Sequence, residues 1–268
     1  MSAQIRKFTI GADPELFIIN EKTGKVVSSI GLIPGIKGEP YVSEDMPKGF
    51  GLETDNILAE FNIPPVTSCE GFINAMNYMK DYIKNFVKKV NPNYGIKCSA
   101  YEVVDEDQLQ SEEAKEFGCS VDYNCYTEAP NPKPDGALTN GRSAGCHIHC
   151  GYENPNVETS LKLIRYFDTY VGLVSVLYDQ DVRRRTLYGK AGCFRLCEYG
   201  FEYRPLSAAM YANDKLMRVI WNGVIQAIDA YNKGKMLPDS TYVRTAIDNS
   251  DVELAKQLIN KFGIVISE

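Results

Sequence analysis

Gly145-Cys146-His147-Ile148-His149-Cys150-Gly151 contains both histidines of this 268-residue chain. In an extended strand, side chains alternate between the two faces, so His147 and His149 would share one face. Imidazole is a common metal ligand and also forms hydrogen bonds to anions. The segment therefore predicts a strand with a chemical role. The alternative is a strand in which two buried histidines serve only packing.

The composition is typical of a globular protein that forms its own core, with 44% hydrophobic and 24% charged residues. A net charge of -6 argues against a general attraction to nucleic acid or to anionic membranes. No apolar run approaches the ~20 residues that span a bilayer, and the N-terminus lacks the apolar region of a signal peptide. We therefore expect a cytoplasmic protein.

Hydrophobic periodicity divides the chain into strands and helices in an irregular order. We expect strands over residues 6–20, 26–30, 50–63, 96–104, 145–151 and 194–204. Helices are expected over 69–90, 157–178, 210–232 and 251–262, while 31–48 and 105–142 look irregular. Because hairpin signals connect several strands, the pattern predicts an α+β fold on a mainly antiparallel sheet.

Acidic residues occur inside several of the expected strands, between apolar neighbours. Charged side chains are rare in such positions unless they are paired or bind a metal ion. Strand alternation places Asp13 and Glu15 on one face, and Glu202 and Arg204 on one face. For Asp13 and Glu15 the alternative is a surface pair on an edge strand, where Pro14 is tolerated.

Another acidic stretch contributes Glu53, Asp55 and Glu60. Glu53 and Glu60 are an odd number of residues apart, so they share a face only if a turn or bulge near Asp55 intervenes. Together with His147, these carboxylates would form an oxygen-rich cation site. Such a site suits Mg²⁺ or Mn²⁺ better than zinc.

The eight cysteines leave a zinc site open as an alternative. Cys146 and Cys150, and likewise Cys193 and Cys197, have a spacing that could bind zinc together with the histidines. Without a secretory signal, reduced thiols are expected. We interpret the cysteines as small apolar residues of the core.

Arginines are concentrated between positions 183 and 204. A guanidinium group binds phosphate or carboxylate oxygens through two parallel hydrogen bonds. The first three could instead be the basic end of a helix. Because the chain has no Walker motif and no Gly-x-Gly-x-x-Gly, a P-loop or Rossmann site is not expected. The arginines concerned are Arg183, Arg184, Arg185, Arg195 and Arg204.

These motifs, in this order, resemble the glutamine synthetase and glutamate–cysteine ligase superfamily of carboxylate–amine ligases. Residues 11–18 are similar to the first catalytic strand of glutamine synthetase, and residues 145–149 to its histidine strand. Together with residues 184–192 and 202–207, the set is similar to the phage-encoded COOH–NH2 ligase type 2 family over residues 8–210.

The resemblance implies a curved, mainly antiparallel sheet with helices on its outer face, in a single catalytic domain over residues 1–268. It implies ATP and two or three Mg²⁺ (or Mn²⁺) ions on the concave face. One ion would be held by Glu15, Glu53 and Glu60, and another by Asp13, His147 and Glu202. The ATP-binding residues would be His149, Arg183, Arg184, Arg185, Lys190 and Arg195, and the catalytic residues Arg204, Arg195 and Glu202.

The chain also departs from the family pattern. Asp13 stands where glutamine synthetase has a glutamate, and the small N-terminal domain of that enzyme is missing. A ring assembly is therefore not implied, although a homo-oligomer is compatible with the sequence. If the protein is phage-encoded, the expected location is the host cytoplasm.

The resulting hypothesis is ATP-dependent amide formation through an acyl phosphate, with small-molecule or peptide carboxylate and amine substrates. Candidates for the base that deprotonates the amine are Asp122, Glu128 and Asp135. Alternatives are a phosphotransferase resembling guanidino kinases, a zinc protein, and a ligase fold that serves only as an interaction module.

Overall fold

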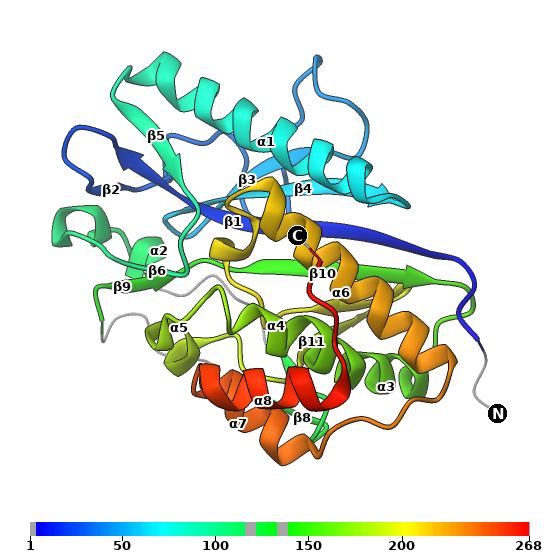
Figure 1. Ribbon diagram of the computed structural model, residues 1–268. Coiled ribbons are helices and arrows are strands. Elements are labelled where there is room, and N and C mark those ends of the chain that lie inside the picture. The colour runs from blue at the N-terminus through cyan, green and yellow to red at the C-terminus, as the bar shows by residue number, and fades with distance from the viewer. Residues whose placement is uncertain (1–3, 116–121, 133–138, 268) are drawn as a thin grey trace.

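A long antiparallel sheet organises the computed structural model, which describes residues 4–115, 122–132 and 139–267 (Figure 1). Within these residues ten strands join one sheet, and its strand pairs are antiparallel. The main path, in spatial order, is β3 (Gly51–Asp55), β4 (Leu58–Val66), β1 (Phe8–Asn20), β10 (Cys146–Tyr152), β12 (Gly200–Tyr203), β11 (Cys193–Cys197), β7 (Tyr123–Asn124) and β8 (Ala129–Pro130).

β1 is the strand on which the sheet is built. Its first part lies between β4 and β10, and its last residues pair with β2 (Val26–Val27) and β5 (Tyr94–Lys97). A strand that alternates and then ends in the apolar run Leu16-Phe17-Ile18-Ile19 can be buried on both faces. The expected mixture of helices with a mainly antiparallel sheet is therefore confirmed.

Helices cover one face of this sheet. In Figure 1, α1 and α6 cross in front of the strands, and α1 contacts β4 and β5 while α3 contacts β12. None of the helices in the described ranges is long and apolar enough to cross a membrane. The longer helices are α1 (Cys69–Val90), α3 (Val157–Phe167), α6 (Asp214–Asn232), α7 (Ser240–Asp248) and α8 (Val252–Phe262).

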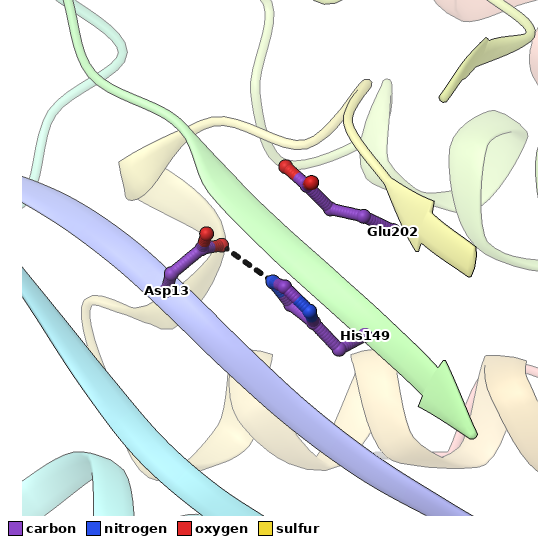
Figure 2. Close-up of side chains that lie close together, drawn as sticks. All are labelled: Asp13, His149 and Glu202. Atoms are coloured by element: carbon purple, nitrogen blue, oxygen red, sulfur yellow. Dashed lines mark ion pairs between the residues drawn. The ribbon is translucent and has the colours of Figure 1, made fainter. Parts of the chain in front are cut away.

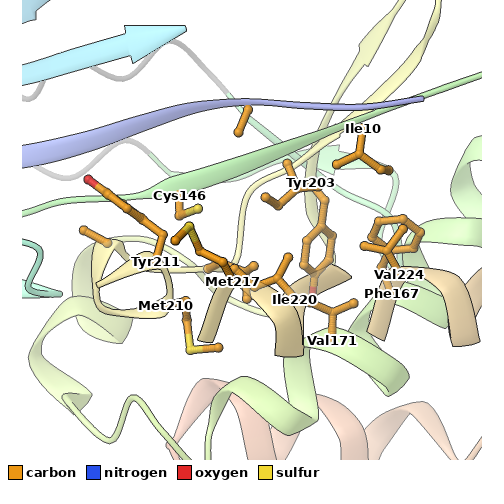
Figure 3. Packing of buried hydrophobic residues seen from close by; sticks show 14 of the residues in the cluster. Ile10, Cys146, Phe167, Val171, Tyr203, Met210, Tyr211, Met217, Ile220 and Val224 are labelled. Carbon is orange, nitrogen blue, oxygen red and sulfur yellow. The ribbon is translucent and has the colours of Figure 1, made fainter. Parts of the chain in front are cut away.

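The core lies between the sheet and these helices. Ile10, Cys146 and Tyr203, from three neighbouring strands, point toward Met217 and Ile220 of α6 (Figure 3). Because strand side chains alternate, the residues that adjoin Ile10, Cys146 and Tyr203 along their strands point to the opposite face of the sheet. That opposite face carries the candidate site.

Two expected elements are divided in the structure. The strand expected over 96–104 is split between β5 of the main sheet and β6 (Tyr101–Val103), which pairs with β9 (Gly141–Ser143). The helix expected over 157–178 is interrupted by a π-helical turn, Asp168–Gly172, before the short α4 (Leu173–Ser175). In that turn the Asp168 carboxylate accepts hydrogen bonds from tyrosines of other segments, which local periodicity cannot reveal.

Several short elements were not expected from the sequence. α5 (Val182–Leu187) begins after an N-cap at Asp181, and α7 begins after an N-cap at Asp239. The stretch 105–142, expected to be irregular, contains α2 (Glu112–Lys115), β7 and β8 in its described parts. Such short segments carry too few residues for a clear periodicity.

The packing of α1 gives a matched test of the core. Val87 is fully buried, whereas Val90, one turn later in the same helix, is 61% exposed. Val87→Ala should lower the free energy of unfolding by about 1–3 kcal/mol, and Val90→Ala by less than about 0.5 kcal/mol. Urea unfolding of both variants measures the difference, and equal effects would contradict the burial of this helix face.

Candidate functional site

The strand register brings the predicted acids and histidines together on the face opposite the helices. Asp13 of β1 is the cross-strand partner of His147 of β10. On the other side of β10, His149 is the partner of Glu202 of β12. All four side chains share one sheet face, as strand alternation predicts.

Asp13, His149 and Glu202 form a first group of candidate metal ligands (Figure 2). One ligand atom from each residue lies within 4.8 Å of the others. His149 Nε2 is 3.0 Å from Asp13 Oδ1. His147 Nδ1 is 3.4 Å from the same oxygen and 3.3 Å from Glu202 Oε1, so His147 borders the group as well.

The charges within this group stabilise one another. Burial alone would raise the pKa of Asp13, but the charges and hydrogen bonds of His149 and His147 outweigh burial and hold that pKa well below its ordinary value. Burial would lower the pKa of His149, but the neighbouring Asp13 and Glu202 carboxylates raise it. Asp13 is therefore ionised at neutral pH.

Glu15, Asp55 and Glu60 form a second group, and all three are buried. Their ligand atoms also lie within 4.8 Å of one another. Burial, together with the Asp13, Asp55 and Glu15 charges, raises the pKa of Glu60 well above its ordinary value. Lys37 Nζ is 2.8 Å from Asp55 Oδ1. One lysine does not balance three carboxylates, so a bound cation would relieve their repulsion.

A two-residue turn aligns Glu53 with Glu60. Asn56 adopts a left-handed conformation at φ 59°, and the turn makes Glu53 and Glu60 cross-strand partners, as the odd spacing required. The Glu53 carboxylate, however, accepts a hydrogen bond from Gly38 N at 3.0 Å and is not in the group of three. Asp55 lies in that group instead, and its one sequence signal was that it shares a strand face with Glu53.

Glu202 is in contact with two arginines. Arg195 Nη1 lies 3.2 Å from Glu202 Oε2, and Arg204 Nη1 pairs with Glu202 Oε1. Arg204 Nε is also 3.9 Å from Asp122 Oδ2. Of the proposed base candidates, Asp122 therefore lies at the site, Glu128 is exposed, and Asp135 falls outside the described residues.

The three consecutive arginines separate into different environments. Arg183 is exposed, pairs with Asp181 at 2.6 Å and lies over the ring of Tyr101. Arg184 is buried and donates hydrogen bonds to the backbone carbonyls of residues 144, 205 and 206. Arg185 is also buried and donates to Pro205 O at 2.7 Å. Burial of Arg184 and Arg185 does not fit the alternative of a solvated basic helix end.

Two cavities adjoin the two acidic groups. A small cavity of about 30 Å³ is lined by charged residues, among them Glu15, Asp55, His147, Arg184 and Arg204. A more open pocket of about 390 Å³ reaches Asp13 and His149, and its walls include Gly11, Pro64, Pro65 and Tyr199. The site therefore has a small charged side and a wider, more apolar side.

Of the four cysteines proposed for zinc, two lie on the sheet face opposite the histidines, whereas Cys193 and Cys197 flank Arg195, the cross-strand partner of Glu202. Cys146 and Cys150 alternate with His147 and His149 and are buried in the core. Burial raises the pKa of Cys150 to about 12, which disfavours the thiolate that zinc requires. Neither of the ligand groups found in the described residues contains a cysteine. The structure therefore lends the zinc alternative no support.

Asp168 supports the site from the helix side and was missed in the sequence. It is fully buried and accepts hydrogen bonds from Tyr126 Oη at 2.9 Å and Tyr203 Oη at 2.8 Å. Burial raises the pKa of Asp168 to about 7, although both tyrosines oppose this. Because Tyr203 lies between Glu202 and Arg204, Asp168 anchors the strand that carries them. Its sequence signal is a lone acid within an apolar helical stretch.

Metal binding should distinguish Asp55 from Glu53. Both are acids of β3, but only the Asp55 carboxylate lies in the second group. Asp55→Asn should weaken Mn²⁺ binding by at least about tenfold because an oxygen ligand loses its charge, while Glu53→Gln should have a smaller effect. Titration of the free Mn²⁺ electron paramagnetic resonance signal measures both. A stronger effect of Glu53→Gln would contradict the structure.

The buried Asp168 should make stability depend on pH. Its pKa is about 7 in the folded state against an ordinary 3.8, so its stabilising contribution is complete below about pH 4 and is lost as the pH rises through 7. The Asp168→Asn variant has no titratable group at this position. Between pH 5 and pH 8, its free energy of unfolding should therefore rise by about 2–3 kcal/mol relative to that of the wild type. Urea unfolding at both pH values tests this, and an unchanged difference would contradict it.

Comparison with known families agrees with these motifs. Residues 136–247 match the model of the family described as phage phiEco32-like COOH.NH2 ligase-type 2. No curated protein matches the chain. The matched segment contains both histidines, the three consecutive arginines, and Glu202 with Arg204, so the predicted family resemblance is confirmed there. The family name describes an enzyme that joins a carboxyl group to an amine.

Proposed function

We propose, from this family match and the two acidic groups, that the chain is an ATP- and Mg²⁺-dependent carboxylate–amine ligase. The observation that carries the proposal is the pairing of two ligand groups, one of them fully buried, with Arg195 and Arg204 on one sheet face. Metal–phosphate chemistry needs such a combination, because cations must offset the charge of a transferring phosphoryl group.

The residues of both groups fit divalent ions with hard ligands. Asp13, His149 and Glu202, with His147 beside them, would hold one ion, and Glu15, Asp55 and Glu60 a second. Five of these six ligands are carboxylates, which suit Mg²⁺ or Mn²⁺. When bound, the ions would neutralise phosphate oxygens and orient the reacting groups.

The reaction would proceed in two steps. A substrate carboxylate oxygen attacks the γ-phosphorus of ATP, the bond to the ADP oxygen breaks, and an acyl phosphate forms. An amine then attacks the acyl carbon, inorganic phosphate leaves, and the nitrogen loses a proton. Arg204 and Arg195, adjacent to Glu202, would stabilise charge on the transferred group. Asp122 lines the charged cavity and is the described residue best placed to accept the proton.

The remaining parts of the proposal follow from the resemblance. The sheet, with helices on one face and acids on the other, would correspond to the catalytic domain of the glutamine synthetase superfamily, formed by residues 1–268. Of the residues expected to contact ATP, Arg195 lies at the site, paired with Glu202, whereas His149 is placed among the metal ligands and Arg184 is engaged by backbone carbonyls. Arg183, paired with Asp181, has no part in the proposal. The substrates would be a carboxylate and an amine, as small molecules or peptides.

An activity assay with matched glutamate variants tests this function. ATP, Mg²⁺ and pooled carboxylates and amines should yield ADP and phosphate in equal amounts, dependent on both an acid and an amine. Glu202→Gln should reduce turnover by at least about 100-fold, because it removes a charge at the site of phosphoryl transfer. Glu198→Gln changes an exposed residue between β11 and β12 and should leave turnover unchanged.

The reaction products distinguish a ligase from the alternative functions. Full activity of Glu202→Gln would overturn the site assignment, provided that circular dichroism shows a folded variant. ADP released without phosphate would instead indicate a phosphotransferase, because the phosphoryl group would then remain on the acceptor.

A further inference from the structure

A basic basin lies outside the two acidic groups, between α5 and α7, which lie side by side in Figure 1. It is an open cavity of about 670 Å³. Arg185, Lys190 and Arg244 contribute three cations to its lining, and Asp248 contributes one carboxylate. Thr186, Thr241, Thr245 and Asn249 add neutral hydrogen-bonding groups to the same wall. The basin thus has more positive than negative charge and many donors.

Two of its cations are held in place. Arg185 is only 2% exposed, and its Nη1 donates to Pro205 O at 2.7 Å and to Gly189 O. The guanidinium of Arg244 lies 5.3 Å from the ring centroid of Tyr126. Guanidinium groups fixed in this way lose little conformational entropy when they bind an anion.

The same two guanidinium groups retain unused donors. Within the described part of the chain, neither Arg185 Nη2 nor Arg244 Nε has a hydrogen-bond partner. Buried donors of this kind are uncommon, because each costs the free energy of its lost hydration. The carboxylate in the described lining of the basin, that of Asp248, accepts a hydrogen bond from Ala191 N at 2.7 Å. Asp248 therefore offsets only part of the positive charge.

We propose that this basin is a second anion-binding site, which binds a phosphate or carboxylate group through Arg185, Lys190 and Arg244. The hydroxyl groups of Thr241 and Thr245 are suited to complete the coordination of the anion oxygens. The proposal does not rest on ligase activity: none of its residues belongs to the two acidic groups, and it places Arg185 and Lys190, which the family resemblance assigns to ATP, in a separate basin.

The basin lies beside the turn that leads to the candidate site. A pocket of about 170 Å³ shares Thr186 and Lys190 with the basin, and Asp122 and Gly189 with the charged cavity. Residues 188–192 then lead into β11, which carries Arg195. An anion bound at Lys190 would therefore restrain this turn on the side away from Glu202.

Anion titrations followed by nuclear magnetic resonance test the proposal. The full chain, in metal-free buffer at constant ionic strength, is titrated with inorganic phosphate and separately with malonate. We expect saturable shifts of the amide resonances of residues 185–191 and 241–249. Tighter binding of phosphate would identify a phosphate-bearing ligand, and tighter binding of malonate a carboxylate-bearing one.

The variants remove accessible cations, since replacing the buried Arg185 could unfold the protein. Lys190→Gln/Arg244→Gln should weaken anion binding by at least about tenfold, because two charge-assisted contacts are lost. Arg218→Gln/Lys233→Gln removes the same charge from α6 and from the residue that follows it, and should leave binding unchanged. The absence of saturable shifts in these segments, or equal weakening by both double variants, would overturn the proposal.

Discussion

Repulsion between buried carboxylates is the constraint on which the rest of this structure depends. Two groups of acids lie on one face of the sheet, and burial raises the pKa of Glu60 and Glu15. Such an arrangement is stable only if other charges compensate the buried carboxylates. His147 and His149 do so beside Asp13, and Arg195 and Arg204 do so beside Glu202. In the second group, the ion pair found among the described residues is that of Lys37 with Asp55, and the pKa values of Glu15 and Glu60 remain raised. This asymmetry is the physical reason to infer a bound cation.

Much of this site could be predicted because it lies on strands. The period of two, applied to residues 13–15, 147–149 and 202–204, places the two side chains of each pair on one face of their own strand, and the register between the strands brings the three pairs to the same sheet face. From the odd spacing of Glu53 and Glu60, they could share a face only if a turn or bulge lay near Asp55, and Asn56 makes such a turn. Period alone does not say how far a carboxylate reaches, so it could not show that Glu53 turns to Gly38 N while Asp55 joins Glu15 and Glu60.

The features that the sequence did not reveal depend on contacts between distant segments. The helix expected over 157–178 opens into a π-helical turn where Asp168 meets Tyr126 and Tyr203. The consecutive arginines looked alike, yet Arg183 lies outside, Arg184 at the charged cavity, and Arg185 at the basin with Arg244. Backbone carbonyls that become available only in the fold account for this separation.

Crystals of the protein soaked with Mn²⁺ and a non-hydrolysable ATP analogue would test the central claim most directly. Anomalous scattering locates Mn²⁺ without assumptions about its ligands. The account predicts one peak among Asp13, His149 and Glu202 and another among Glu15, Asp55 and Glu60. Saturating Mn²⁺ without a peak at either group would contradict the claim that these acids hold metal ions.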